Sequence, residues 1–251
     1  MLTSQRKKII LEKLAQEGQV LAKQLSEMFG LSEDTLRRDL RELDSEGLLQ
    51  RVHGGALPVS PAIATFAERN GQEFAAKRAI AKAAAAMIAP GQVVIIDGGT
   101  TSAELVKQLP ATLEATIVTH SPSVAVGLVE HPKVEVILIG GRLYKHSIVS
   151  VGAAAVEAMS HIRADLYFMG VTGVHPTAGL STGDLEEAYI KRALAARAAE
   201  TVVLASAAKL NAASQYAIGD ISLAQSIIVE RSTDAALTAP LEQAGLTVIR
   251  A

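Results

Sequence analysis

The first 57 residues place apolar side chains at the spacing of short helices, with single glycines between them. This pattern predicts three helices, which end near Gly18, Gly30 and Gly47. Val20 and Leu21 are expected to lead into the second helix. The apolar positions that define the helices are Ile9, Ile10 and Leu14 in the first, Leu25, Met28 and Phe29, turned inward, in the second, and Leu36, Leu40 and Leu43 in the third.

The third predicted helix carries arginines opposite its leucines. Ser32 stands where a side-chain cap of the first turn is expected. At about 100° per residue, Arg38 and Arg41 fall on the face opposite the leucine stripe, and Arg37 lies on its flank. Arginine can grip phosphates, or the O6 and N7 atoms of guanine, with two hydrogen bonds. A helix, a glycine turn and a second helix with a basic face match a DNA-binding helix-turn-helix.

A glycine hairpin is predicted directly after this helix. Residues 48–52 read as a strand, residues 53–55 as a tight turn and residues 56–58 as the returning strand. Arg51 and His53 bring cations to a turn whose glycines allow the backbone to approach a phosphate closely. Such a hairpin suits the wing of a winged helix-turn-helix. The candidate DNA contacts given by this pattern are Arg38, Arg41, Arg51, His53, Gly54 and Gly55.

The same charges have a plainer interpretation. Asp34 and Glu42 each stand four residues from Arg38, so the third helix could present a solvated face of ion pairs. The hairpin favours the DNA-binding interpretation, because a solvated helix face does not require a glycine turn with its own cations beside it.

Residues 58–73 read as a linker, and residues 74–251 as one α/β domain. In that domain short apolar strands alternate with helical stretches, which predicts a largely parallel, Rossmann-like sheet. The expected strands are 92–97, 115–119, 134–139, 165–169, 201–205, 226–229 and 246–249, and the expected helices are 74–88, 102–109, 122–130, 185–199 and one before the last strand.

Small polar residues follow several of these strands. Ligands bind at the carboxyl ends of strands in such sheets, and the loop after the first strand leads directly into a helix, whose N-terminus attracts anions. The loop is neither a Walker motif nor a dinucleotide fingerprint, and taken alone it could be a simple turn. With one lysine nearby, the strand ends suit a phosphorylated sugar. The candidate ligand contacts are Asp97, Gly98, Gly99, Thr100, Thr101, Ser102, Thr119, His120, Ser121, Gly140, Gly141, Gly170, Thr172 and Lys209.

Composition narrows the possible classes of protein. Hydrophobic residues make up 49% of the 251 residues, which is enough for a sizeable core, and there is no cysteine. These features, with no apolar leader or membrane-spanning run, lead us to expect a cytoplasmic protein without disulfides. The net charge is −2, so DNA affinity must come from local cations. The six histidines show no metal-ligand spacing, and we expect neither a metal nor a cofactor.

The sequence resembles the DeoR family of bacterial transcriptional regulators over nearly its whole length. The resemblance rests on Thr35-Leu-Arg-Arg-Asp-Leu40 together with Arg51-Val-His-Gly-Gly-Ala56. It implies an effector domain similar in fold to ribose-5-phosphate isomerase and the CoA transferases. It also implies that residues 98–102 and Lys209 hold a sugar phosphate. The resemblance adds Thr35 and Arg37 to the expected DNA contacts, and Glu187 to the expected ligand contacts. Ser32, at the start of the third helix, is also expected to contact DNA.

Two positions depart from the family pattern. His120 stands where asparagine is common, and residues 206–209, Ser-Ala-Ala-Lys, stand where Asp-x-Ser-Lys is common. Both departures concern the hydrogen bonding of the expected pocket.

We expect a repressor of a carbohydrate operon that binds operator DNA as a homodimer or homotetramer and responds to a phosphorylated sugar. The alternative is a phosphosugar isomerase fused to a DNA-binding domain. Isomerisation needs a base, and the loop 170–176 has no carboxylate, although Asp184, Glu186 and Glu187 are near in sequence. Asp97 could act as a base, but is expected to order the loop or bind a hydroxyl. We therefore expect no catalytic residue.

Overall fold

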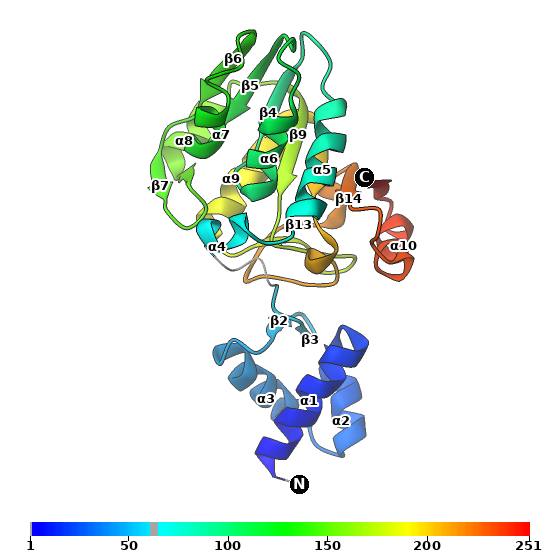
Figure 1. Cartoon of the computed structure of the whole chain (residues 1–251). Coiled ribbons are helices and arrows are strands. Elements are labelled where there is room, and N and C mark those ends of the chain that lie inside the picture. Colours follow the sequence, from blue (N-terminus) through cyan, green and yellow to red (C-terminus); the bar gives the residue numbers. More distant parts are fainter. Residues whose placement is uncertain (1, 61–64) are drawn as a thin grey trace.

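The computed structural model describes residues 2–60 and 65–251, so residues 61–64 of the expected linker lie outside the described residues. Figure 1 shows a small helical unit at the N-terminus and a larger unit of helices around a sheet. The predicted order, a winged helix-turn-helix followed by an α/β domain with a parallel sheet, is confirmed.

The small unit packs three helices against a three-stranded antiparallel sheet in the order β1-β3-β2. Leu36, Leu40 and Leu43 are buried in one cluster with Ile10 and Leu25, as their spacing predicts. The elements of this unit are α1 (Thr3–Glu17), β1 (Val20–Leu21), α2 (Ala22–Phe29), α3 (Glu33–Ser45), β2 (Gln50–Val52) and β3 (Gly55–Leu57).

One strand of this unit was not predicted, and one expectation is wrong. Val20 and Leu21 lead into α2 as expected, and they also form the unpredicted strand β1, which pairs antiparallel with β3. Met28 is 47% exposed and does not point inward. The buried face of α2 is set by Ala22 and Leu25, three residues apart, which turns Met28 toward solvent.

The large unit is built on seven parallel strands in the order β15-β14-β12-β9-β4-β5-β6. The chain places β5 and β6 on one side of β4, then returns to place β9 on the other side. Ligands bind at such a reversal, at the carboxyl ends of the strands. The strands are β4 (Val93–Ile96), β5 (Ala115–Thr119), β6 (Val134–Leu138), β9 (Ala164–Gly170), β12 (Ala198–Leu204), β14 (Ser226–Val229) and β15 (Thr247–Arg250).

Alternate residues of each strand face opposite layers of helices, as the period of two requires. In β4, Val94 and Ile96 belong to the core shared with α5, α6 and α7, whereas Ile95 belongs to the core shared with α8, α9 and α10. The helices are α5 (Phe74–Ala86), α6 (Thr100–Gln108), α7 (Pro122–Gly127), α8 (Ala153–Met159), α9 (Leu185–Ala195) and α10 (Ala235–Gln243).

Several short elements were not predicted, and the expected helix 185–199 ends at Ala195 because β12 already begins at Ala198. The unpredicted elements are too short to show a hydrophobic period. They are α4 (Phe66–Asn70), α8, the hairpin β7 (Arg142–Tyr144) and β8 (Val149–Val151), the small sheet of β10 (Gly173–His175), β11 (Gly179–Thr182) and β13 (Tyr216–Gly219), and the 3-10 turns Ala207–Lys209 and Ile221–Leu223.

A buried ion pair joins the first and third helices of the small unit. Arg6 of α1 donates to both carboxylate oxygens of Asp39 of α3, over 2.5 and 2.9 Å. Arg6 is 5% exposed and Asp39 is fully buried. Two parallel N–H···O bonds fix angle as well as distance, so this pair sets how α3 sits on α1.

We expect Asp39→Ala to destabilise the small unit by about 3–5 kcal/mol, because it leaves the guanidinium of Arg6 buried without its carboxylate. Hydrogen exchange of the backbone amides of α3 measures this as a lower free energy of opening. Glu12→Ala is the control, since its pair with Lys8 is exposed and 3.8 Å long. Equal effects of the two substitutions would contradict the structural role of the buried pair.

Candidate functional site

Two arginines lie on the outer face of α3. Arg38 and Arg41 are exposed, and within residues 2–60 and 65–251 neither forms an ion pair. Ser32 caps the helix by accepting a hydrogen bond from the backbone N–H of Thr35, at 3.3 Å. The cap orders the first turn of the helix whose outer face carries both arginines.

Asp34 and Glu42 of α3, which could have paired with Arg38 on a solvated helix face, instead form ion pairs with other residues. Asp34 and Glu33 pair with Arg37, over 3.1 and 2.6 Å. Glu42 pairs with Lys7 of α1, at 3.0 Å. Arg37 is therefore partly neutralised within its own helix, which leaves Arg38 and Arg41 as the cations available to an external anion.

The wing is held directly against α3. The backbone N–H of Arg51 donates to Asp44 at the end of α3, over 3.0 Å, and Ala22 donates to the carbonyl of Gly54, over 2.8 Å. Arg51, His53 and Gly54 are exposed. Gly55 lies in β3, where a Cβ would stand 2.0 Å from the carbonyl oxygen of Val20, so this glycine serves the approach of β1. The wing is thus attached to the end of α3, and both elements carry exposed cations.

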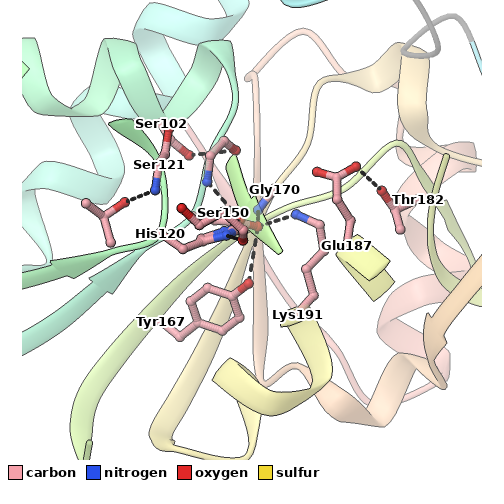
Figure 2. Close-up of polar contacts among 12 residues, drawn as sticks. Ser102, His120, Ser121, Ser150, Tyr167, Gly170, Thr182, Glu187 and Lys191 are labelled. Carbon is pink, nitrogen blue, oxygen red and sulfur yellow. Dashed lines mark hydrogen bonds and ion pairs between the residues drawn. The ribbon is translucent and has the colours of Figure 1, made fainter. Parts of the chain in front are cut away.

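A second site is built around Asp97, at the carboxyl end of β4. Figure 2 shows Lys191, His120, Tyr167 and Gly170 converging on one point. That point is the Asp97 carboxylate, which accepts from Lys191 Nζ at 2.5 Å, His120 Nε2 at 2.7 Å, Tyr167 at 3.2 Å and the N–H of Gly170 at 2.9 Å. The N–H of residue 98 adds a bond of 2.8 Å. The Asp97 carboxylate thus connects the loop at residue 98 to β9, to α9 and to the end of β5.

The groups around Asp97 stabilise its charged form, and the charge of Asp97 in turn keeps Tyr167 protonated. Burial by itself would raise the pKa of Asp97, but the ammonium of Lys191 and the hydrogen bond from His120 outweigh burial and hold that pKa well below its usual range. Burial and the neighbouring carboxylate raise the pKa of Tyr167, which stays a donor. The other ring nitrogen of His120 faces the carbonyl of Ser150, at 3.0 Å.

Two adjoining cavities lie beside this cluster and share Arg69, Thr100 and Lys209. The larger has a volume of about 260 Å³ and the narrower one about 30 Å³. The larger is also lined by Gln72, Glu73, Lys77 and Ala208, and the narrower by Gly98, Thr101, Ser102, Ser147, Gly170, Val171, Thr172, Thr182, Glu187, Lys191 and Leu204.

The candidate ligand residues divide into two groups. Eight of them line the cavities: Gly98, Thr100, Thr101, Ser102, Gly170, Thr172, Glu187 and Lys209. The others do not: Asp97, Gly99, Thr119, His120, Ser121, Gly140 and Gly141. Of these, Asp97, Thr119, His120 and Ser121 are buried. Gly141 packs where a Cβ would stand 2.9 Å from the carbonyl oxygen of Val151.

Sequence reasoning missed three cations of this site. Lys191 stands four residues after Glu187 in a predicted helix, so both fall on one face, and that spacing could have identified it. Lys77 shares a helical stripe with the buried Ile80, Ala81 and Ala84, which also marks it. Arg69 had no such signal, since it lies in the segment interpreted as a linker.

Lys209 is the most perturbed cation in the cavities. It is 9% exposed. Burial, together with the nearby positive charges of Arg69 and Lys77, lowers the pKa of its ammonium to about 7. A bound anion would reverse this balance, because the anion favours the charged ammonium. The cavity is thus suited to take up an anionic group.

Comparisons with known proteins support the class of protein that these two sites define. Residues 6–62 match the DeoR-like helix-turn-helix domain, and residues 72–231 match the DeoR C terminal sensor domain. The HTH-type transcriptional regulator GlpR of Haloferax volcanii is 35% identical, covering 99% of this chain and 98% of the relative. The glycerol-3-phosphate regulon repressor of Escherichia coli is 30% identical, covering 92% of each.

Among solved structures, ribose 5-phosphate isomerase A of Methanocaldococcus jannaschii is similar to 53% of this chain and 52% of that chain, with a TM-score of 0.39 and 18% identity. In the part of the chain that the structure describes, none of the helices is long and apolar enough to cross a bilayer. A winged helix joined to a sensor domain defines a DNA-binding transcriptional regulator. The chain belongs to the DeoR family of such regulators.

The pKa of Lys209 predicts a pH dependence of anion binding. Below pH 7 the ammonium is already charged, so the affinity for sulfate should level off. Above pH 7 Lys209 must take up a proton to pair with the anion, and the affinity should fall by up to about tenfold per pH unit. Sulfate is the probe because its charge is constant over this range, and isothermal titration calorimetry from pH 6 to 9 measures it.

Burial also lowers the pKa of Lys77, which faces the same cavity. Lys209→Met separates the two lysines: it should bind sulfate weakly and with a flatter pH profile. Lys82→Met, on the exposed side of α5, is the control and should behave as the wild type. An unchanged profile in Lys209→Met would assign the titration to another group.

Proposed function

We propose that this regulator represses a carbohydrate operon and that a phosphorylated sugar, bound in the cavities beside Asp97, alters its affinity for operator DNA. The observation that carries the proposal is the cationic cavity at the reversal point of the sheet, in the same chain as a basic helix and wing. Effectors change DNA affinity through a coupling free energy of typically about 1–3 kcal/mol.

The chemistry of the cavity lining supports a sugar phosphate. The N-terminus of α6, at residues 100–102, offers backbone N–H groups and hydroxyls to a phosphate, and Lys209 adds a positive charge. Glu187, Thr172 and Thr182 line the same narrow cavity. Carboxylates and hydroxyls of this kind bind the hydroxyls of a sugar. The site therefore has separate groups for each half of such a ligand.

The geometry favours sensing over catalysis. A general base must be free to accept a proton, but Asp97 already accepts five hydrogen bonds. Asp184 caps α9 by accepting from the backbone N–H of Glu187, over 3.0 Å. Glu187 is the carboxylate left facing the narrow cavity, and we assign it to a sugar hydroxyl. The isomerase alternative is therefore not adopted.

We also propose which part of the chain binds DNA, which part binds the effector, and how many chains assemble. Residues 1–57 bind DNA. Residues 58–73 connect the two units and contribute Arg69, Gln72 and Glu73 to the cavity wall, and residues 74–251 form the rest of the effector site. One helix and one wing bury a small area on DNA, so specific binding requires a homodimer or homotetramer on repeated half-sites. A regulator of this kind acts where the chromosome is, in the cytoplasm.

Fluorescence anisotropy tests the proposal. The probe is a labelled duplex from the region upstream of this protein's own transcription unit, with competitor DNA at fixed salt. Pentose and hexose phosphates, glycerol 3-phosphate and the free sugars are then titrated. One phosphorylated compound should change specific binding and its free sugar should not. Specific binding that no phosphorylated compound changes would contradict the assigned effector class.

Replacing Arg38 with alanine should weaken operator binding by about 10- to 100-fold, corresponding to about 1–3 kcal/mol for a two-bond arginine contact. If Arg38 contacts phosphates instead, the slope of log affinity against log salt should become shallower by about 0.9. Lys133→Ala is the control, since Lys133 is exposed in the α/β unit and pairs with Glu114. Operator binding by Arg38→Ala at wild-type strength would remove α3 from the interface.

Replacing Lys209 with alanine should spare operator binding in the absence of effector and raise the effector concentration needed for a response by about 10- to 100-fold. The reason is the loss of a charge-assisted hydrogen bond to the phosphate. The same anisotropy titration measures both quantities. A variant that lost operator binding but kept its effector response would show that the two units do not divide the work in this way.

A further inference from the structure

The short helix α4 brings a residue of the connecting segment, residues 58–73, into the effector cavities. Its Arg69 lines both the larger and the narrower cavity. Figure 1 shows α4 beside the lower end of the α/β unit, where the chain arrives from the small unit. The segment between the two units thus forms part of the wall of the cavity.

Helix α4 is held at both ends. At its start, Thr65 and Glu68 form a capping box, and the N–H of Phe66 donates to the carbonyl of His146, over 3.1 Å. At its end, the ammonium of Lys77 donates to the carbonyls of Arg69 and Gln72, over 2.5 and 2.7 Å. A helix of one turn is not stable alone, so these contacts determine where Arg69 lies.

The charges around the larger cavity are suited to an anion. Arg69, Lys77 and Lys209 line it together with a single carboxylate, Glu73. Glu73 accepts a hydrogen bond from Ser206, over 2.7 Å. Burial lowers the pKa of Arg69, which Glu187 opposes, and the guanidinium remains charged in any protein environment. Three cations against one carboxylate favour a doubly charged ligand.

We propose that Arg69 is a direct ligand of the anionic group of the effector, so that the bound effector joins the connecting segment to the sheet. The proposal rests on the proposed function, since it names one more residue of the same site. A guanidinium can bind two oxygens of one phosphate at once. Lys77 acts as a positioning residue, because its ammonium holds the carbonyl of Arg69.

The other attachment of the connecting segment meets the same cavity. Ser60 donates a hydrogen bond to the carbonyl of Thr172, and Val59 forms a bridge with Ala213. Thr172 lines the narrow cavity and donates to Ser214, over 2.7 Å. Arg69 and Ser60 thus connect two places in the connecting segment to the cavity wall, one by lining it and one through Thr172.

Calorimetric titration of Arg69→Ala with the sugar phosphates of the panel and with inorganic phosphate tests the proposal. The affinity for sugar phosphates should fall about 10- to 100-fold. Arg69→Lys, which keeps the charge but not the paired geometry, should lie between Arg69→Ala and the wild type. Arg78→Ala removes an exposed arginine of α5 outside these cavities and should bind as the wild type.

Hydrogen exchange supplies a readout that a merely structural role would not move. In the wild type, the sugar phosphate should slow exchange of the amides of residues 65–77, and in Arg69→Lys this protection should be reduced at saturating ligand. If the wild type binds a sugar phosphate and Arg69→Ala binds it equally well, the inference alone is wrong. If the wild type binds no member of the panel, the proposed function fails and the inference fails with it.

Discussion

A charged carboxylate can stay in a protein interior only when donors surround it, and this constraint organises the effector domain. Asp97 is fully buried at the end of β4. Its donors come from the end of β5, from β9 and from α9, through His120, Tyr167, Gly170 and Lys191. The strands that meet at the reversal of the sheet are thereby fixed relative to α9. The loop from residue 98 to the start of α6 inherits its position from the same carboxylate.

The sequence was sufficient where one period dominated. The leucine stripe of α3 identified both the buried face and the basic face of one helix, because the period of 3.6 couples them. The main strands were recognisable because a parallel sheet covered on both faces needs continuous apolar runs. A cavity beside Gly98 and the start of α6 could be predicted because glycines and hydroxyls stand between a predicted strand and a predicted helix. Each of these inferences uses only neighbours in sequence.

The rest depends on contacts between distant residues. The sequence predicted that His120 contacts the ligand. In the structure its ring lies behind the cavity wall, against Asp97 and the carbonyl of Ser150. The sequence placed Gly55 in the tight turn of the hairpin. In the structure it lies in β3, where the absence of a side chain lets the backbone of Val20 pass close by. Helix α4 has five residues and no apolar period, and its place depends on Lys77 and the carbonyl of His146. Such residues are assigned only when the packing of the whole domain is known.

The position of α4 also bears on how regulators of this family can be recombined. The match to the helix-turn-helix domain ends at residue 62 and the match to the sensor domain begins at residue 72, so α4 lies between the two. A hybrid biosensor joined at residue 72 would combine the cavity of one protein with the α4 of another. Its ligand preference would then depend on both parents. A junction just before residue 58 transfers the cavity with all of its walls.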